Sequence, residues 1–329
     1  ALEIYEQYRR RLRERGAVPG PAMRAAHEAV LAAESPVRRG LEPEPEHFLG
    51  RETDVTGVLK ALSTHRLVTL TGPGGVGKTT LAQVVAARSR RPAVYVVALA
   101  EVSPGADLAK VVLDAVGGPA VVDGDPHRDL AAALSQPGTV LVLDNCEHLA
   151  GEAADLIGPL LVACPDLRVL ATSRRPLDLA AEHVHRLDAL DATSSAELFR
   201  VRALAARPGQ VIDDDDLAEL LRRLEGIPLA IELAAARTRS LSVGQIAERL
   251  PGRPDLLTAA RDAPARQRTL TAVIEWSWNL LDAAERRALA RLALLADGFT
   301  LVPAEALIGA QAADLLDALV SHSLLVVRD

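Results

Sequence analysis

Short apolar runs alternate with amphipathic stretches through the middle of the chain. β-Branched and other apolar residues cluster in five runs that predict strands, at Leu67–Thr71, Ala93–Ala100, Thr139–Asp144, Arg168–Thr172 and Val184–Leu187. Helical spacing of apolar residues predicts helices at Asp54–Ser63, Thr79–Ser89, Ala106–Val116, Arg128–Ser135 and Ala150–Cys164. Such alternation is typical of an α/β domain whose parallel sheet is covered by helices on both faces. We expect this domain at residues 48–191.

The predicted strands stop after residue 191. Helices alone are predicted over residues 192–255, at Ser194–Ala206, Asp215–Leu224, Leu229–Arg239 and Ser242–Leu250. Residues 256–329 add three helices and a closing strand, at Thr269–Leu281, Asp282–Leu295, Ala312–His322 and Leu324–Val327. Three helices followed by a strand suggest a winged-helix domain. The chain is therefore predicted to be multidomain, with the α/β domain followed by a helical domain and a winged helix.

A short helical hairpin is predicted before the α/β domain, within residues 1–40. Its helices carry ALEIYEQYRRRL and, after a turn, PGPAMRAAHEAVL. This pair resembles the closing hairpin of the bacterial transcriptional activator domain in AfsR/SARP-type regulators, and it fits a tetratricopeptide-like helix pair equally well. Residues 41–47 are predicted to be an extended linker. Their LEPEPE run is rich in proline and acid, and a residue before proline is pushed out of the helical conformation.

Residues 72–80 read GPGGVGKTT, which has the Gly72-x-x-x-x-Gly77-Lys78-Thr79 spacing of a phosphate-binding P-loop. Glycines let backbone N–H groups turn toward phosphate, the lysine adds a charge for the β and γ oxygens, and the hydroxyl completes a Mg²⁺ shell. An ordinary glycine-rich turn would not need the strand, the helix, the lysine and the hydroxyl together. The sequence therefore predicts that ATP or ADP is bound by Gly72, Gly74, Gly75, Val76, Gly77, Lys78, Thr79 and Thr80.

The predicted strand that ends at Asp144 delivers a carboxylate to the carboxyl edge of the sheet, where open α/β sheets bind ligands. We expect Asp144 and Thr79 to hold Mg²⁺, directly or through water. The next residue is Asn145, which cannot act as a base. Glu147 is the nearest carboxylate that could polarise a water, although a place at the start of the next helix explains it equally well. This pattern predicts a weak ATPase at most.

An arginine at the end of the following strand is a candidate sensor of the γ-phosphate. The run LATSR places Arg174 there, and a guanidinium forms bonds of fixed geometry with phosphate oxygens. An ordinary loop arginine is the alternative, and Arg175 follows directly. The P-loop and the aspartate upstream favour Arg174. The candidate catalytic residues are therefore Lys78, Asp144, Glu147 and Arg174.

Composition narrows the classes of partner. The chain of 329 residues has a net charge of −7, which argues against general binding to nucleic acid or membrane surfaces. Its only lysines are Lys60, Lys78 and Lys110, and its two cysteines fit no metal spacing and suggest a reducing compartment. No apolar run is long enough to cross a bilayer, so we expect a cytoplasmic protein. The opening on Ala1 without a methionine suggests a piece of something longer.

Five motifs, FLGRE, GPGGVGKTT, LVLDN, ATSR and GIPLA, lie in the order and rough spacing of the NB-ARC and STAND signal-transduction ATPases. The chain resembles that family over residues 48–329. The resemblance implies that Leu49 and Arg51 approach the adenine, and that Pro228 packs on the base from an ARC1-like helical domain. It also implies a winged helix that closes over ADP through a histidine. His322 lies before the expected position and is not assigned that role.

Together with the hairpin, this resemblance implies the nucleotide switch of a large AfsR/SARP-type transcriptional regulator. ADP would hold the domains closed, whereas ATP would bring its γ-phosphate to Arg174 and Lys78 and favour an open, self-associating form. DNA would be bound by domains outside this chain. The alternatives are a multiple-turnover AAA-type ATPase, a DNA-binding winged helix, and a LuxR-type STAND regulator with its DNA-binding domain downstream. Asn145 counts against the first, and the acidic third helix of the winged-helix segment counts against the second.

Overall fold

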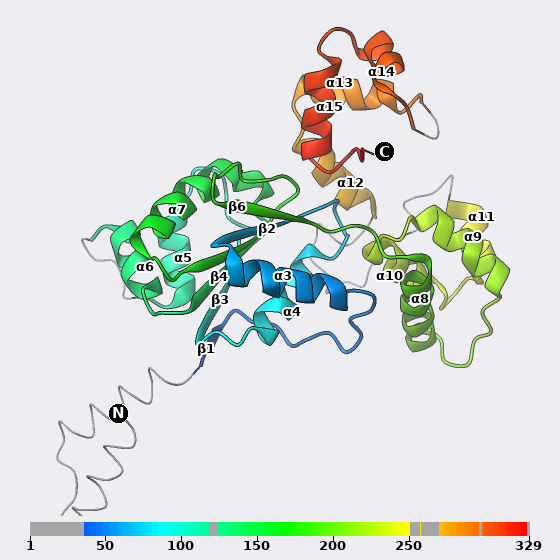
Figure 1. Ribbon diagram of the computed structural model, residues 1–329. Helices are drawn as coiled ribbons and strands as arrows, with labels where there is room; N and C mark the ends of the chain where they lie inside the picture. The colour runs from blue at the N-terminus through cyan, green and yellow to red at the C-terminus, as the bar shows by residue number, and fades with distance from the viewer. Residues whose placement is uncertain (1–35, 119–123, 251–256, 258–269, 296–297, 328–329) are drawn as a thin grey trace, which may run out of the picture.

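The computed structural model describes residues 36–118, 124–250, 257, 270–295 and 298–327 (Figure 1). The helices of the predicted hairpin lie outside these residues. Three groups of elements are visible: an α/β domain, a helical unit beside it, and a smaller C-terminal group of helices. No helix in the described part of the chain is both long enough and apolar enough to cross a membrane.

The α/β domain is built on a six-stranded parallel sheet in the order β1-β3-β4-β5-β2-β6. The strands are β1 Val37–Arg39, β2 Leu67–Thr71, β3 Ala93–Ala98, β4 Thr139–Asp144, β5 Arg168–Thr172 and β6 Glu182–Arg186. The five predicted strands are confirmed, with shifts of one or two residues at some ends. The strand that sequence analysis missed is β1, which pairs with β3 at the sheet edge. Its sequence VRR has no apolar pattern, so only the pairing reveals it.

Helices cover both faces of the sheet. On one face lie α3 Glu52–Thr64 and α4 Lys78–Arg88, and on the other α5 Leu108–Val116, α6 Pro126–Leu134 and α7 Ala150–Ala163. Within β4, Val140 and Val142 belong to the core under α3 and α4, whereas Leu141 and Leu143 belong to the core under α5 to α7. A strand covered on both faces is apolar at successive positions, which explains the continuous run that predicted it.

The helical unit consists of α8 Ala192–Ala206, α9 Asp214–Leu224, α10 Pro228–Arg237 and α11 Val243–Arg249. These helices share a core that includes Phe199, Leu220 and Ile231, each fully buried. The acidic run before α9 has a local explanation: the Asp213 carboxylate caps the helix by accepting hydrogen bonds from the N–H groups of Asp215 and Asp216. All four helices predicted for this segment are confirmed.

The C-terminal helices are α12 Leu270–Asn279, α13 Ala283–Leu292, α14 Leu301–Ile308 and α15 Ala312–Ser321. Leu292, Ala304 and Leu319 bring α13, α14 and α15 together in a small core. Sequence analysis missed α14 and wrongly predicted a strand at Leu324–Val327. The N–H groups of Leu324 and Leu325 instead bond to the Leu319 carbonyl, so the chain folds back on the end of α15. This local turn leaves those N–H groups unable to form a strand ladder.

Candidate nucleotide-binding site

The loop between β2 and α4 forms an open cradle of backbone N–H groups. Gly75 and Gly77 have φ values of 80° and 101°, in the left-handed region that favours glycine. A Cβ at Gly77 would meet nothing within 4 Å, so its backbone conformation, and not crowding, requires glycine there. Gly77 is the N-cap of α4 and offers no capping side chain. The first N–H groups of the helix are therefore left for an anion.

Lys78 lies in this cradle at the start of α4. Its ammonium donates hydrogen bonds to the carbonyls of Gly72, at 2.7 Å, and Pro73, at 3.0 Å, so it bridges the loop. Burial lowers the pKa of Lys78 from 10.5 to about 8, although the nearby carboxylate of Glu147 raises it. A phosphate group in the cradle would supply the negative charge that this buried ammonium otherwise finds only in neighbouring side chains.

Asp144 ends β4 next to the cradle and is only 4% exposed. Its Oδ1 accepts hydrogen bonds from the hydroxyls of Thr79, at 2.8 Å, and Thr172, at 2.6 Å. A hydroxyl and a carboxylate so close together present the oxygen ligands that Mg²⁺ prefers. The donor set therefore fits this ion, which Thr79 and Asp144 would hold and which would neutralise phosphate charge.

Arg174 is buried at the end of β5. Its Nε lies 3.4 Å from Oε1 of Glu147, and its guanidinium donates a hydrogen bond to the Ser277 hydroxyl on α12. The Ser323 hydroxyl, just after α15, donates to the Arg174 carbonyl at 2.6 Å. Arg174 thus joins the α/β domain to both ends of the C-terminal helical group. It also lines a cavity at the P-loop, whereas Arg175 does not.

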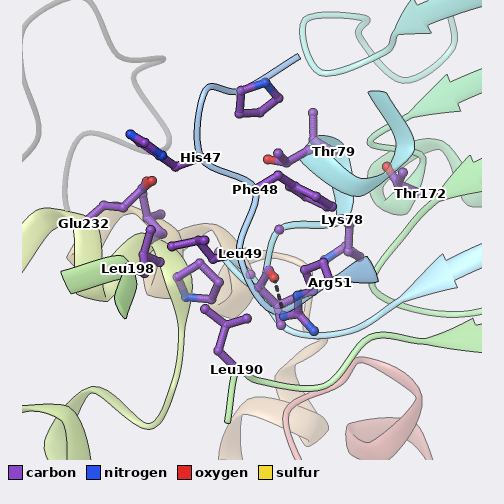
Figure 2. Close-up of a pocket in the computed structure, with 18 of the residues that line it drawn as sticks. His47, Phe48, Leu49, Arg51, Lys78, Thr79, Thr172, Leu190, Leu198 and Glu232 are labelled. Carbon is purple, nitrogen blue, oxygen red and sulfur yellow. Dashed lines mark hydrogen bonds between the residues drawn. The ribbon is translucent and has the colours of Figure 1, made fainter. Parts of the chain in front are cut away.

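A cavity of about 340 Å³ lies between the P-loop and the helical unit (Figure 2). Of the predicted nucleotide-binding residues, the structure brings Leu49, Arg51, Pro228 and the loop from Gly74 to Thr80 to its wall. Gly72 is not part of the wall; its carbonyl instead accepts from Lys78. The residues that sequence analysis did not find are Pro45, His47, Phe48, Thr172, Leu190, Leu198, Arg202, Leu229 and Glu232.

Arg51 has a structural part in shaping the cavity. Its guanidinium donates to the carbonyls of Val76, at 3.1 Å, and Asp188, at 2.7 Å, and pairs with Asp54 at 3.2 Å. These bonds tie the P-loop to the segment that leads toward α8. The predicted approach of Arg51 to adenine stays a prediction, since its guanidinium is already bonded to the protein at these three places.

The helical unit closes one side of the cavity through α8 and α10. The N–H of Leu229 donates a hydrogen bond to the Gly75 carbonyl at 3.2 Å, and a Cβ at Gly75 would lie 3.0 Å from Cβ of Leu229. Leu198 from α8 and Glu232 from α10 face the same space (Figure 2). By contrast, His322 lies 3.7 Å from Glu285 within the C-terminal group and does not line the cavity.

Binding of ADP should be coupled to proton uptake that grows between about pH 7.5 and pH 9. In the empty protein the pKa of Lys78 is about 8, and the phosphate charge raises it, so the lysine regains its proton on binding. Affinity should therefore be constant well below pH 8 and fall as the pH rises above it. Calorimetry in two buffers of different ionisation enthalpy measures the uptake. Equal heats in both buffers at pH 9 would contradict this assignment.

A parallel sheet with a phosphate-binding loop after β2 and a buried aspartate at the end of β4 defines a P-loop nucleotide-binding protein. A model of the AAA ATPase domain matches residues 47–212, which is half of the chain. The chain therefore belongs to the family of AAA ATPase domains.

The chain is similar to proteins of Mycobacterium and Streptomyces, some of which are named as regulators. An uncharacterized protein of Mycobacterium tuberculosis is 40% identical over 267 residues, which are 79% of this chain and 68% of the relative. A second protein of that organism, named provisionally as an HTH-type transcriptional regulator, is 41% identical over 280 residues, 82% of this chain and 32% of the relative. Regulatory protein AfsR of Streptomyces griseus is 31% identical over 365 aligned positions, 98% of this chain and 36% of the relative. The chain thus spans about a third of the length of these two regulators.

A solved structure supports the fold. The Walker-type ATPase of Pyrococcus abyssi superposes with a TM-score of 0.62, covering 89% of this chain and 94% of that protein. At 16% sequence identity this likeness concerns the fold alone.

Proposed function

We propose that this chain is a nucleotide-controlled switch, in which ATP or ADP with Mg²⁺ binds at the seam between the α/β domain and the helical unit. The observation that carries this proposal is the shared cavity wall. The P-loop lines one side of the cavity, Pro228 and Leu229 of α10 line another, and the Leu229–Gly75 hydrogen bond joins them. A ligand shifts a conformational equilibrium only through different affinities for the two states. Contacts from two units to one nucleotide supply such a difference.

The contacts of Arg174 support a second coupling, between the bound nucleotide and the C-terminal helices. In this conformation its guanidinium is bonded to Glu147 and Ser277. A γ-phosphate would compete for the same guanidinium, because arginine binds phosphate oxygens with charge-assisted bonds. We infer that ADP favours a closed arrangement in which Arg174 keeps these bonds, and that ATP loosens the C-terminal group and promotes self-association. The C-terminal helical group would then correspond to the winged helix of the NB-ARC and STAND ATPases, without its closing strand.

The names of the relatives support a place in transcription. Two of them are named as regulators, and this chain spans about a third of the length of each. We infer that this chain is the NB-ARC/STAND-like module of an AfsR/SARP-type regulator, whose DNA-binding domain lies in another part of the protein. A multiple-turnover AAA-type ATPase is the alternative, and the amide of Asn145 directly after Asp144 disfavours it.

The switch is tested by the nucleotide and the mass of the purified protein. Denaturation should release about one ADP per chain, and light scattering should show a monomer with ADP and a larger species with a non-hydrolysable ATP analogue. Binding of both nucleotides with the same mass and the same hydrodynamic radius would contradict the switch. Sustained rapid turnover of ATP would favour the motor instead.

A further inference from the structure

Two buried polar atoms at the phosphate end of the cavity have no hydrogen-bond partner among the described residues. They are Nδ2 of Asn145, a donor, and Oε2 of Glu147, an acceptor. Both residues line the cavity beside Lys78 and Thr172. Buried polar atoms are nearly always satisfied, and an unpaired one calls for an explanation such as an absent water or ligand. A water molecule in this cavity would offer an acceptor to the one atom and a donor to the other.

The backbone after β4 places these two side chains. Asn145 has a φ of 70°, a left-handed conformation that asparagine tolerates better than most residues. Its N–H donates to the Thr172 hydroxyl at 2.8 Å, and the N–H of Cys146 donates to the Thr172 carbonyl at 2.8 Å. The chain is thereby fixed to the end of β5, and Glu147 begins the short 3-10 helix η1, Glu147–Leu149, at the cavity wall.

The charges around Glu147 keep its carboxylate in place. Its side chain is 6% exposed, and Oε1 lies 3.4 Å from Nε of Arg174. Glu147 also acts on the ammonium of Lys78 as a nearby negative charge. In this conformation one carboxylate oxygen is therefore held by a cation, while the other has no hydrogen-bond partner among the described residues. Glu147 lies three residues after Asp144 and, unlike the amide of Asn145, can accept a proton from water.

We propose that Asn145 and Glu147 together hold the water that attacks the terminal phosphate of bound ATP. Asn145 donates a hydrogen bond to the water oxygen, and Oε2 of Glu147 accepts a proton from it. The water oxygen forms a bond to the γ-phosphorus while the bond from that phosphorus to the β–γ bridging oxygen breaks. ADP leaves with that electron pair, and the proton held by Glu147 passes to the phosphate product. This inference rests on the nucleotide binding proposed above, and it makes the switch able to return itself to the ADP state.

The test uses three variants of the whole chain. Glu147→Gln keeps the size of the side chain but removes the base, and Asn145→Gly keeps the left-handed backbone but removes the amide. Asp155→Asn, on the exposed surface of α7, is the matched control. Each protein is measured for single-turnover hydrolysis of bound ATP, for affinity for ADP, and for affinity for ADP with aluminium fluoride, which imitates the planar phosphoryl group and its water.

General-base catalysis typically contributes 10²–10⁴ in rate, so Glu147→Gln should hydrolyse ATP about 100-fold more slowly or worse. Asn145→Gly should be slower by about tenfold, since one neutral hydrogen bond is lost. Both should bind ADP within about threefold of wild type while losing tenfold or more in affinity for ADP with aluminium fluoride.

Wild-type rates in either variant would overturn the proposal, and so would equal losses for ADP and the analogue. A wild-type protein that binds no nucleotide would instead refute the proposed function, and one that binds ATP without hydrolysing it would refute this inference alone.

Discussion

Replacing Lys78 with alanine should weaken ADP binding by about 100- to 1000-fold. The ammonium bridges two loop carbonyls inside the cradle, and a nucleotide would replace them with phosphate oxygens. A hydrogen bond to a charged group contributes about 1.5–3 kcal/mol, and each 1.4 kcal/mol is a factor of ten, so two bonds at the lower end of this range, about 1.5–2 kcal/mol each, give a loss of this size. Isothermal titration calorimetry at pH 7, where Lys78 carries its charge, measures the change directly.

The matched control for that variant is Lys110→Ala. Lys110 lies on the exposed side of α5 and does not line the cavity. It should bind ADP as tightly as wild type, because it removes the same charge at a distance from the site. If Lys78→Ala loses less than tenfold in affinity, or if both variants lose equally, the cradle is not the phosphate site.

Replacing Phe199 with alanine should lower the free energy of unfolding of the helical unit by about 3–5 kcal/mol, the usual cost of truncating a buried phenylalanine. Phe199 is fully buried in the core that α8 shares with α9, α10 and α11. Because α8 and α10 carry Leu198, Pro228 and Leu229 to the cavity, ADP affinity should fall with the stability of this unit. Urea denaturation followed by circular dichroism measures the unfolding transition.

Leu204→Ala is the control for this change on the same helix. Leu204 is 45% exposed, so its truncation should cost well under the loss at Phe199, about 1 kcal/mol or less. Its ADP affinity should stay at the wild-type value. Similar destabilisation by the two variants would contradict the packing described for this unit.

The α/β domain was predictable because its signals are local. The strand before the P-loop, the spacing Gly72 to Thr79, and the apolar run ending at Asp144 each lie within about ten residues of sequence. Parallel strands then bring their carboxyl ends to one edge, which is how Thr79 and Asp144 come within 2.8 Å. Simple chemistry and one topological rule were sufficient for this part of the site.

The other side of the cavity depends on contacts that no local pattern encodes. Leu190, Leu198 and Leu229 read as ordinary core residues of a helical segment, and only the packing of that unit on the P-loop directs them to the site. Sequence analysis also missed β1, since a three-residue edge strand has too little apolar pattern. The predicted final strand was wrong because a local turn brings its first N–H groups to a carbonyl at the end of α15, where they form their hydrogen bonds.

Glu147 shows what position adds to residue type. From the sequence it was equally a candidate base and the first residue of a helix, and η1 does begin at Glu147. The structure adds the ion pair with Arg174 and the unpaired Oε2, which turn an ambiguous acid into part of the proposed water site. Neither feature follows from the spacing between Asp144 and Glu147.

Hydrogen exchange with and without ADP tests most directly whether one nucleotide joins the two units. Peptides covering the P-loop, residues 72–80, should be protected by ADP, and so should peptides from α8 and α10, residues 192–206 and 228–237. The protection of α8 and α10 should be lost in Lys78→Ala, which binds ADP poorly. Protection confined to the P-loop, with α8 and α10 exchanging at the same rate in the empty and ADP-bound protein, would contradict the account.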